Sequence, residues 1–375
     1  MISGGRQRVD IVIPHVDGDV RGYEALCRQI TGAFVPCQLR DLGELRFVLR
    51  SIEKHAGWAN VVLAVQSDGH VPAWLNRQAV RVVHHADFLP PELLPTFHWG
   101  TIAAHLHRIS GLSEKFVLWD DDVLVGSNLR PDDLFGSDGV LGLPWTKTPI
   151  FFGLGKLLGI YQLNLEETRR ALCRILGRKV NAFLYPHAPL PGTTASWSAF
   201  HDAAMSDPSF RSTVTRRSRG DERKLPTVDP LVMYANWIEL KAKGLTDRRR
   251  LCQAIGTIVG LPGGRAPSRR MSAKKYAVVN DEARMRRHME GLRKACAEAT
   301  DRKIRFLNVN DDAYDSWKRD GAAIGGDVVN PASVRLLRET LAGLFPDPSH
   351  FEIQEAGQAA AELEGGSSIP AGARA

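Results

Sequence analysis

The 375-residue chain is 43% hydrophobic and has a formal net charge of +7, a composition that supports a sizeable core in one large or two ordinary domains. No segment approaches the roughly 20 apolar residues of a membrane span, and the N-terminal residues lack the apolar stretch of a secretion signal. The five cysteines are scattered and odd in number, which predicts reduced thiols in a cytoplasmic protein and argues against a disulfide framework.

The first part of the chain alternates short apolar runs with amphipathic segments. Buried strands are predicted at Val9–Val16, Asn60–Gln66 and Val80–His84. Helices are predicted at Asp41–His55, where apolar residues recur at helical spacing, and at Trp99–Ile109. This alternation has the spacing of βαβ units, so it predicts an α/β fold with a mostly parallel, Rossmann-like, doubly wound sheet.

The predicted helix Asp41–His55 carries charged residues that bear on function. Asp41 is placed to cap its N-terminus. Arg46 and Arg50 lie four residues apart and therefore on one side of the helix. They form either a solvated basic stripe or a clamp for a pyrophosphate, since the guanidinium fork matches phosphate oxygens.

In the next predicted helix the histidines are spaced wrongly for a metal-binding pair. His105 and His107 are only two residues apart, so they point to different sides of the helix. A hydrogen-bonded structural role is more common for such residues. Arg108 is the better candidate for a substrate contact.

The stretch Phe116–Gly126 places three adjacent acids, Asp120, Asp121 and Asp122, directly after a short apolar run. At the carboxyl end of a buried strand these acids would face the crevice in which open α/β sheets bind ligands. Asp17 follows the first predicted strand and would share that edge if the two strands are parallel neighbours. Carboxylate oxygens suit Mg²⁺ or Mn²⁺. The alternative is an acidic turn between two strands of a hairpin.

The second part of the chain is predicted to be mainly helical. Residues 1–150 form a nucleotide-binding α/β half, and residues 151–353 form a second half that completes the site. Segment 246–275 is rich in Arg, Gly and Pro and is predicted to be a mobile insertion, and residues 354–375 a disordered tail. Strands are predicted at Val140–Trp145 and Ile304–Val309, and helices at Leu157–Lys179, Leu231–Lys243, Ala283–Ala299 and Pro331–Phe345.

Four segments together resemble the Stealth family of sugar-phosphate transferases. VDIVIPHVDGD (9–19) resembles the first family region, and the span Asp41–Asp133 resembles the second, which is the most specific. His187 with Arg217 and Asp221 resembles the third region, and RFLNVNDD (305–312) with LFPDPSHFE (344–352) the fourth. The chain departs from the family pattern at Pro14-His15, Leu42 and Asp120, where Thr-Trp, Asn and Asn are usual.

The resemblance implies transfer of a sugar-1-phosphate from a nucleotide-sugar donor, with a UDP-sugar as first choice, to a hydroxyl of an acceptor glycan. It implies a glycosyltransferase-A-like fold with a helical lobe, Mg²⁺ or Mn²⁺ as cofactor, and a role in capsular or exopolysaccharide synthesis. Peripheral association with a membrane-bound export machinery is left open. The implied metal ligands are Asp121, Asp122 and Asp311; the implied catalytic residues are His187, Arg217, Asp41 and Asp17; the implied substrate contacts are Arg46, Arg50, Arg108, Asp221 and Asn310.

Two other functions compete with this interpretation. A glycosyltransferase that moves the sugar alone would also need carboxylates at a strand end and a pyrophosphate clamp. The residues that distinguish it are His187 and Arg217, which such a reaction does not require. A nucleic-acid-binding protein is the more distant alternative, suggested by the net charge. The basic segment Arg248–Lys275 lacks interleaved aromatic residues and no recognition module is evident, so no nucleic-acid partner is expected.

Overall fold

The computed structural model describes most of the chain, with several gaps. The described residues are 8–32, 34–136, 148–149, 160–184, 187–218, 227–242, 270–301, 303–312 and 329–353. Among them, no helix combines the length and apolar character needed to cross a bilayer. The predicted strand Val140–Trp145, the tail 354–375 and most of segment 246–275 lie outside the described residues.

The central sheet has five strands in the order β3-β2-β1-β4-β8. Strands β1 (Val9–Pro14), β2 (Asn60–Val65), β3 (Val80–His84) and β4 (Lys115–Leu118) are parallel, and β8 (Leu190–Thr193) pairs antiparallel with β4. Because helices cover both faces of such a sheet, its strands are nearly continuous apolar runs rather than alternating ones. The predicted mostly parallel α/β sheet is confirmed.

A second sheet joins segments that are far apart in sequence. Strand β10 (Lys303–Asp311) pairs antiparallel with β5 (Val123–Val125) and parallel with β9 (Arg270–Val278). The prediction that segment 246–275 is a mobile insertion is therefore wrong for residues 270–275, since they belong to β9. Their ladder is completed by β10, a partner that local composition does not indicate.

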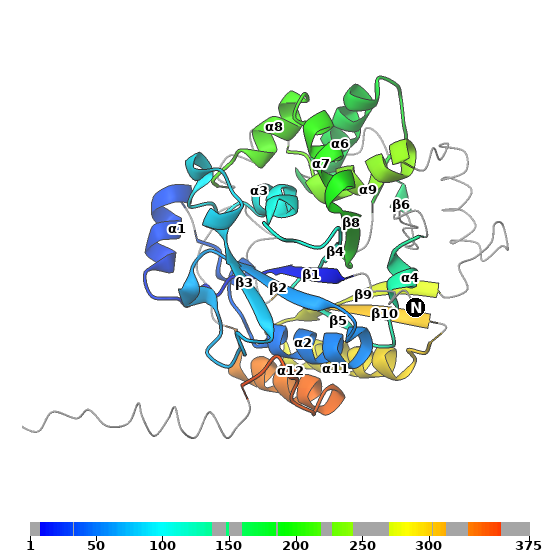
Figure 1. Ribbon diagram of the computed structural model, residues 1–375. Coiled ribbons are helices and arrows are strands. Elements are labelled where there is room, and N and C mark those ends of the chain that lie inside the picture. Colours follow the sequence, from blue (N-terminus) through cyan, green and yellow to red (C-terminus); the bar gives the residue numbers. More distant parts are fainter. Residues whose placement is uncertain are drawn as a thin grey trace, which may run out of the picture.

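The helices form two groups on opposite sides of the central sheet (Figure 1). On one side lie α3 (Trp99–His105), α6 (Ile160–Leu176), α7 (Thr194–Ala204), α8 (Pro208–Val214) and α9 (Pro230–Trp237). On the other lie α2 (Glu44–Ala56), α11 (Glu282–Ala297) and α12 (Pro331–Leu344). The remaining elements are helices α1 (Tyr23–Thr31) and α4 (Pro131–Leu134), the strand pair β6 (Thr148–Pro149) and β7 (Phe183–Leu184), and short 3-10 or π turns at Pro36–Gln38, Asp68–His70, His85–Asp87, Pro91–Leu93, Leu106–Arg108 and Ile238–Ala242.

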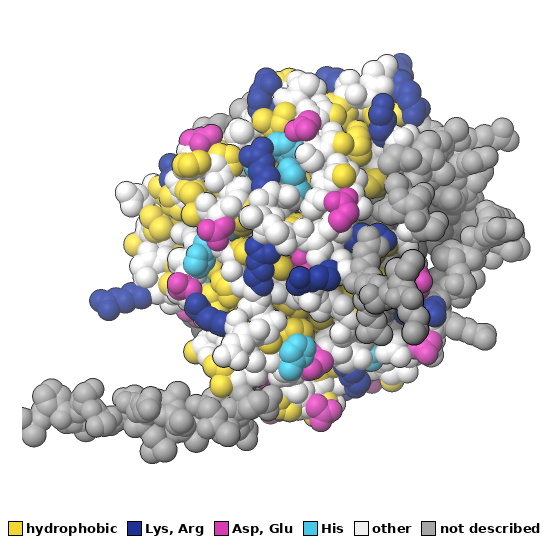
Figure 2. Space-filling view, in the orientation of Figure 1, with side chains coloured by type: hydrophobic (Ala, Val, Ile, Leu, Met, Phe, Trp, Pro, Cys, Tyr) yellow, Lys and Arg dark blue, Asp and Glu magenta, His cyan; other side chains and the backbone are white. Residues whose placement is uncertain are grey.

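Charged side chains are intermixed on the face seen in Figure 2, where Lys and Arg lie among Asp and Glu and do not gather over one element.

The helix boundaries follow the predictions closely, with one correction. The structure starts α2 after Gly43, whose φ of 103° is not helical, so Gly43 and not Asp41 is the N-cap residue. The Asp41 carboxylate instead accepts a hydrogen bond from the Gly43 backbone N–H at 2.7 Å.

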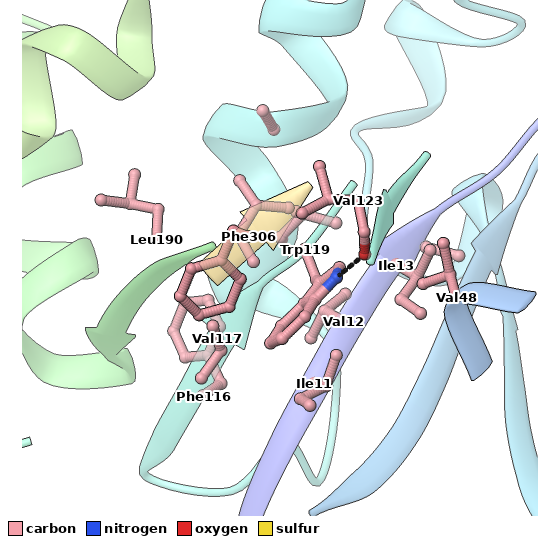
Figure 3. Close-up of a cluster of buried hydrophobic side chains, with 14 of the residues drawn as sticks. Ile11, Val12, Ile13, Val48, Phe116, Val117, Trp119, Val123, Leu190 and Phe306 are labelled. Atoms are coloured by element: carbon pink, nitrogen blue, oxygen red, sulfur yellow. Dashed lines mark hydrogen bonds between the residues drawn. The ribbon is translucent and has the colours of Figure 1, made fainter. Parts of the chain in front are cut away.

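Trp119 connects the two sheets at the end of β4 (Figure 3). Its ring is fully buried and packs against Phe306 of β10, with ring centroids 5.5 Å apart. Its indole N–H donates to the Val123 carbonyl at 2.7 Å and so closes the acidic turn between them. Because β4 and β5 belong to different sheets, the alternative of a hairpin around these acids is wrong.

Candidate metal and phosphate site

The acidic triplet lies where the strand order of the central sheet reverses. Strands β1 and β4 are parallel neighbours, with Val12 opposite Leu118, and the Trp119 backbone N–H donates to the Val12 carbonyl at 2.9 Å. Asp17 and the triplet therefore follow the same edge of the sheet, as the sequence predicted. The crevice at such a reversal is the usual ligand site of open α/β sheets.

Three side chains converge beside this edge. Asp120, Asp122 and His187 each offer a ligand atom, and these atoms all lie within 4.8 Å of one another. His187 Nδ1 lies 3.4 Å from Asp120 Oδ2 and 3.2 Å from the Asn308 side-chain nitrogen. Asn308, buried on β10, also hydrogen-bonds the Asp122 carboxylate. The second sheet thus supports the ligands that follow β4.

The electrostatics of this triad are those of a site short of positive charge. Burial raises the pKa of Asp122 to about 7, and burial also raises the pKa of Asp120. The negative charge of Asp120 is the main cause that raises the pKa of His187. Asp122 Oδ1 is buried with no hydrogen-bond partner among the described residues. Two carboxylates, one of them with this unsatisfied buried oxygen, and an imidazole form a donor set that suits Mn²⁺ or Mg²⁺.

Asp121, a predicted metal ligand, points elsewhere. Its Oδ2 accepts a hydrogen bond from His15 Nδ1 at 2.7 Å, and it is not part of the group around His187. The first and third acids of the triplet, rather than the second and third, are therefore the pair that geometry brings together.

The predicted ligand Asp311 is engaged by an arginine. Asp311 Oδ2 accepts from Arg40 Nε at 2.7 Å, and both side chains are largely buried. Asn310, a predicted substrate contact, donates to Asp312 Oδ1 at 2.7 Å. The position on β10 that reaches the triad is Asn308, two residues earlier.

The two arginines of α2 contact the C-terminal segment. Arg50 donates from Nε and Nη2 to the two Glu352 oxygens at 2.7 and 2.8 Å, and from Nη1 to the carbonyls of Phe345 and Pro346. Arg46 stacks over the Trp74 ring at 4.8 Å and lies 3.6 Å from Glu352. All Arg50 nitrogens are thus used inside the fold, which gives it a structural role that the helical spacing alone did not indicate.

Arg217 contacts the backbone of Pro95 and Phe97 and is not one of the three side chains of the triad. Its Nε donates to the Pro95 carbonyl at 3.0 Å, and its own carbonyl accepts from the Phe97 N–H. Phe97 packs on Tyr23, and Tyr23 packs on His70, which hydrogen-bonds the Asp17 backbone. The predicted contact Asp221 lies outside the described residues.

Comparison with known proteins finds a family match in the N-terminal half of the chain. A family model described as Stealth protein conserved region 2 matches residues 38–142. The chain carries Stealth conserved region 2. The matched span includes the α2 arginines and the acidic triplet, whereas His187 and Asn308 lie outside it.

Three bacterial relatives are similar to part of this chain. The chain is 42% identical over 98 residues to capsular polysaccharide phosphotransferase WcwK of Streptococcus pneumoniae, covering 26% of this chain and 30% of the relative. It is 32% identical over 173 residues to receptor polysaccharide phosphotransferase WefC of Streptococcus oralis, covering 43% and 51%. It is 44% identical over 140 residues to exopolysaccharide phosphotransferase SCO6023 of Streptomyces coelicolor, covering 35% and 24%. The matches therefore span about half of these relatives' length or less.

Several residues at or beside this site were missed by sequence reasoning. Asn308, His15 and Lys275 were not predicted to contribute, although Lys275 is close enough to His187 to affect its charge. The signal for Asn308 was a polar residue between the apolar residues Leu307 and Val309 of a predicted strand. His15 was visible only as a departure from the family pattern, and its partner could not be inferred without the strand order.

Arg108 lies beside a cluster of three histidines, away from the acids. The ring centroids of His105 and His107 each lie 5.1 Å from that of His201. The positive charge of Arg108 helps to lower the pKa of all three histidines. Burial is the main cause that lowers the pKa of His105 to about 4 and of His107 to about 3, and it also lowers the pKa of His201. The cluster is therefore neutral in the folded protein near neutral pH.

Acid is expected to destabilise the fold through this cluster. As pH falls below 6.5, the unfolded chain binds protons that the folded cluster excludes, so each histidine lowers the free energy of unfolding by up to about 1.4 kcal/mol per pH unit. His105→Asn keeps a donor near the Nδ1 position, which bonds the Thr101 carbonyl, but cannot titrate. Urea unfolding between pH 7.5 and 4.5 should show that the free energy of unfolding falls less steeply with pH for this variant than for wild type. An unchanged slope would contradict the assignment.

Proposed function

We propose that this chain transfers a sugar-1-phosphate from a nucleotide-sugar donor, with a UDP-sugar as first choice, to a hydroxyl of an acceptor glycan. The product is a phosphodiester, and a nucleoside monophosphate leaves. The observation that carries the proposal is the convergence of Asp120, Asp122 and His187 at the strand-order reversal. Both acids lie inside the match to Stealth conserved region 2, and the chain is similar in part to named polysaccharide phosphotransferases. A role in capsular or exopolysaccharide synthesis follows from the same relatives.

The chemistry of the donor explains why such a site is needed. Cleavage between the two phosphorus atoms places charge on phosphate oxygens, not on the sugar ring, so the site must neutralise charge and align an acceptor hydroxyl. A divalent cation, when bound, would neutralise phosphate charge and polarise the phosphoryl oxygens. Asp120, Asp122 and His187 would hold it, and Lys275, 54% exposed, is placed to contact a phosphate.

His187 retains a second role in this proposal. Its side chain is 61% exposed, and only its Nδ1 contacts Asp120 and Asn308. Nε2 has no partner among the described residues, so it would accept the proton of an acceptor hydroxyl when Nδ1 carries its own proton toward Asp120. In that role Asp120 and Asp122 would hold the cation without His187. The proposal also includes a substrate contact by Arg217. Its backbone bonds to Phe97, which packs on Tyr23, and Tyr23 packs on His70 beside Asp17.

The strand order β3-β2-β1-β4 with an antiparallel neighbour supports a glycosyltransferase-A-like architecture as part of the proposal. The cysteines are scattered and odd in number, which supports a cytoplasmic site of action. Peripheral attachment to a membrane-bound export machinery would then bring the enzyme to its acceptor.

The fate of the donor's β-phosphate tests the proposed reaction. Purified protein is incubated with nucleotide sugars labelled at the β-phosphate, with acceptor glycan and Mn²⁺ or Mg²⁺. The label is expected in the glycan product, with release of the nucleoside monophosphate. Label that stays in a nucleoside diphosphate would show a glycosyltransferase that moves the sugar alone. Activity that is undiminished in EDTA would overturn the cation part of the proposal.

A further inference from the structure

His15 and Asp121 form a pair that the proposed reaction has not yet used. The His15 side chain is 1% exposed, and its Nδ1 lies 2.7 Å from Asp121 Oδ2. The His15 backbone N–H donates to the Ala64 carbonyl of β2 at 2.9 Å, so the ring is held at the end of β1 by the sheet itself. A donor fixed in this way determines where the Asp121 carboxylate points.

Asp121 differs from its two neighbours in its surroundings. Its side chain is 36% exposed, whereas that of Asp120 is 19% exposed and Asp122 Oδ1 is buried. Its Oδ2 is bonded to His15, and the 36% exposure of the side chain leaves the carboxylate accessible to a ligand. The triplet is therefore divided: two acids converge on His187, and the middle one is held on the β1 side near Asp17 and Asp41, whose charges reach His15.

We infer that His15 is a positioning residue that turns Asp121 away from Asp120, Asp122 and His187, so that its free oxygen accepts a hydrogen bond from a sugar hydroxyl of the substrate. A carboxylate oxygen is a strong acceptor for hydroxyl groups. The inference rests on the proposed function for the identity of the substrate, and the hydroxyl can come from the donor sugar or from the acceptor glycan. Without His15, Asp121 is free to swing toward the other carboxylates and join the cation.

A matched pair of substitutions tests the position of the donor. An asparagine side chain can place its N–H₂ close to the Nδ1 position of histidine, whereas glutamine reaches the Nε2 position. His15→Asn should keep most of the activity. His15→Gln and Asp121→Asn should each lower kcat/KM by about 10- to 100-fold, and the double variant should be no worse than either. A rise in KM for the nucleotide sugar or for the glycan distinguishes the two sources of the hydroxyl.

Binding of Mn²⁺ alone, followed by electron paramagnetic resonance, gives a readout that does not depend on the reaction. Asp121→Asn should leave Mn²⁺ affinity unchanged, because Asp121 is not a ligand. His15→Gln should bind Mn²⁺ more tightly, and adding Asp121→Asn should remove that gain. The inference is overturned if His15→Asn behaves like His15→Gln, if the two effects on kcat/KM add, or if Asp121→Asn alone weakens Mn²⁺ binding. Failure of the proposed function would instead appear as wild-type protein that splits no nucleotide sugar while the Mn²⁺ results hold.

Discussion

Asp122→Asn is expected to lower kcat by on the order of 10³-fold and to abolish Mn²⁺ binding, because it removes a charged ligand from the triad. Asp122 is the most constrained of the three proposed ligands: its side-chain Oδ1 is buried without a partner among the described residues, and its backbone carbonyl accepts from the Val309 N–H at 2.8 Å. The amide has nearly the same shape, so loss of charge is the change that is tested. Asp132→Asn, at an exposed acid of α4, is the matched control and should behave as wild type.

The same substitution should stabilise the protein when no metal is present. Burial raises the pKa of Asp122 from 3.8 to about 7, so its contribution to stability is complete below about pH 4 and is lost as pH rises through 7. At pH 8 the metal-free Asp122→Asn variant should therefore exceed wild type by on the order of 4 kcal/mol in free energy of unfolding. The difference should vanish toward pH 4. Added Mn²⁺ should stabilise wild type alone. Equal stabilisation of both proteins by Mn²⁺ would show that Asp122 is not a ligand.

The sheet and the edge that carries the site could be predicted because both depend on local patterns. Apolar runs such as Val9–Val16 bury themselves wherever they pair, and acids placed directly after them must lie at strand ends. What those acids contact depends on residues that are distant in sequence. His187 reaches Asp120 from the segment before β8, and Asn308 reaches Asp122 from β10. The group around the acids therefore depends on two long-range contacts, which the spacing of apolar residues does not predict.

Arginine partners were the least predictable part of the site for the same reason. A guanidinium group satisfies its donors with any carboxylate or carbonyl that the fold brings near, and spacing along a helix says only which arginines share a side. Arg50 and Glu352 are separated by 302 residues in sequence yet form a bidentate pair. The family resemblance included both segments, but it did not show that one is the partner of the other.

Arg50→Ala is therefore expected to lower the free energy of unfolding by about 3–5 kcal/mol, the usual cost of removing one partner from a buried ion pair. Both side chains are shielded from solvent, at 12% and 7% exposure, and the change leaves Glu352 buried without its main cation. It also releases the Phe345 and Pro346 carbonyls that fasten the end of α12 to α2. Urea unfolding measures the loss, and Arg50→Ala combined with Glu352→Gln should recover part of it.

The same variant discriminates a structural arginine from one that clamps phosphate. At a temperature where Arg50→Ala remains folded, KM for the nucleotide sugar should be unchanged, since all of the nitrogens lost were bonded within the protein. Arg46→Ala is the matched comparison on the same helix: it is 36% exposed and stacks on Trp74, so only about 0.5–1 kcal/mol of stability should be lost. A large rise in KM without loss of stability for Arg50→Ala would return that residue to the phosphate-binding role predicted from the sequence.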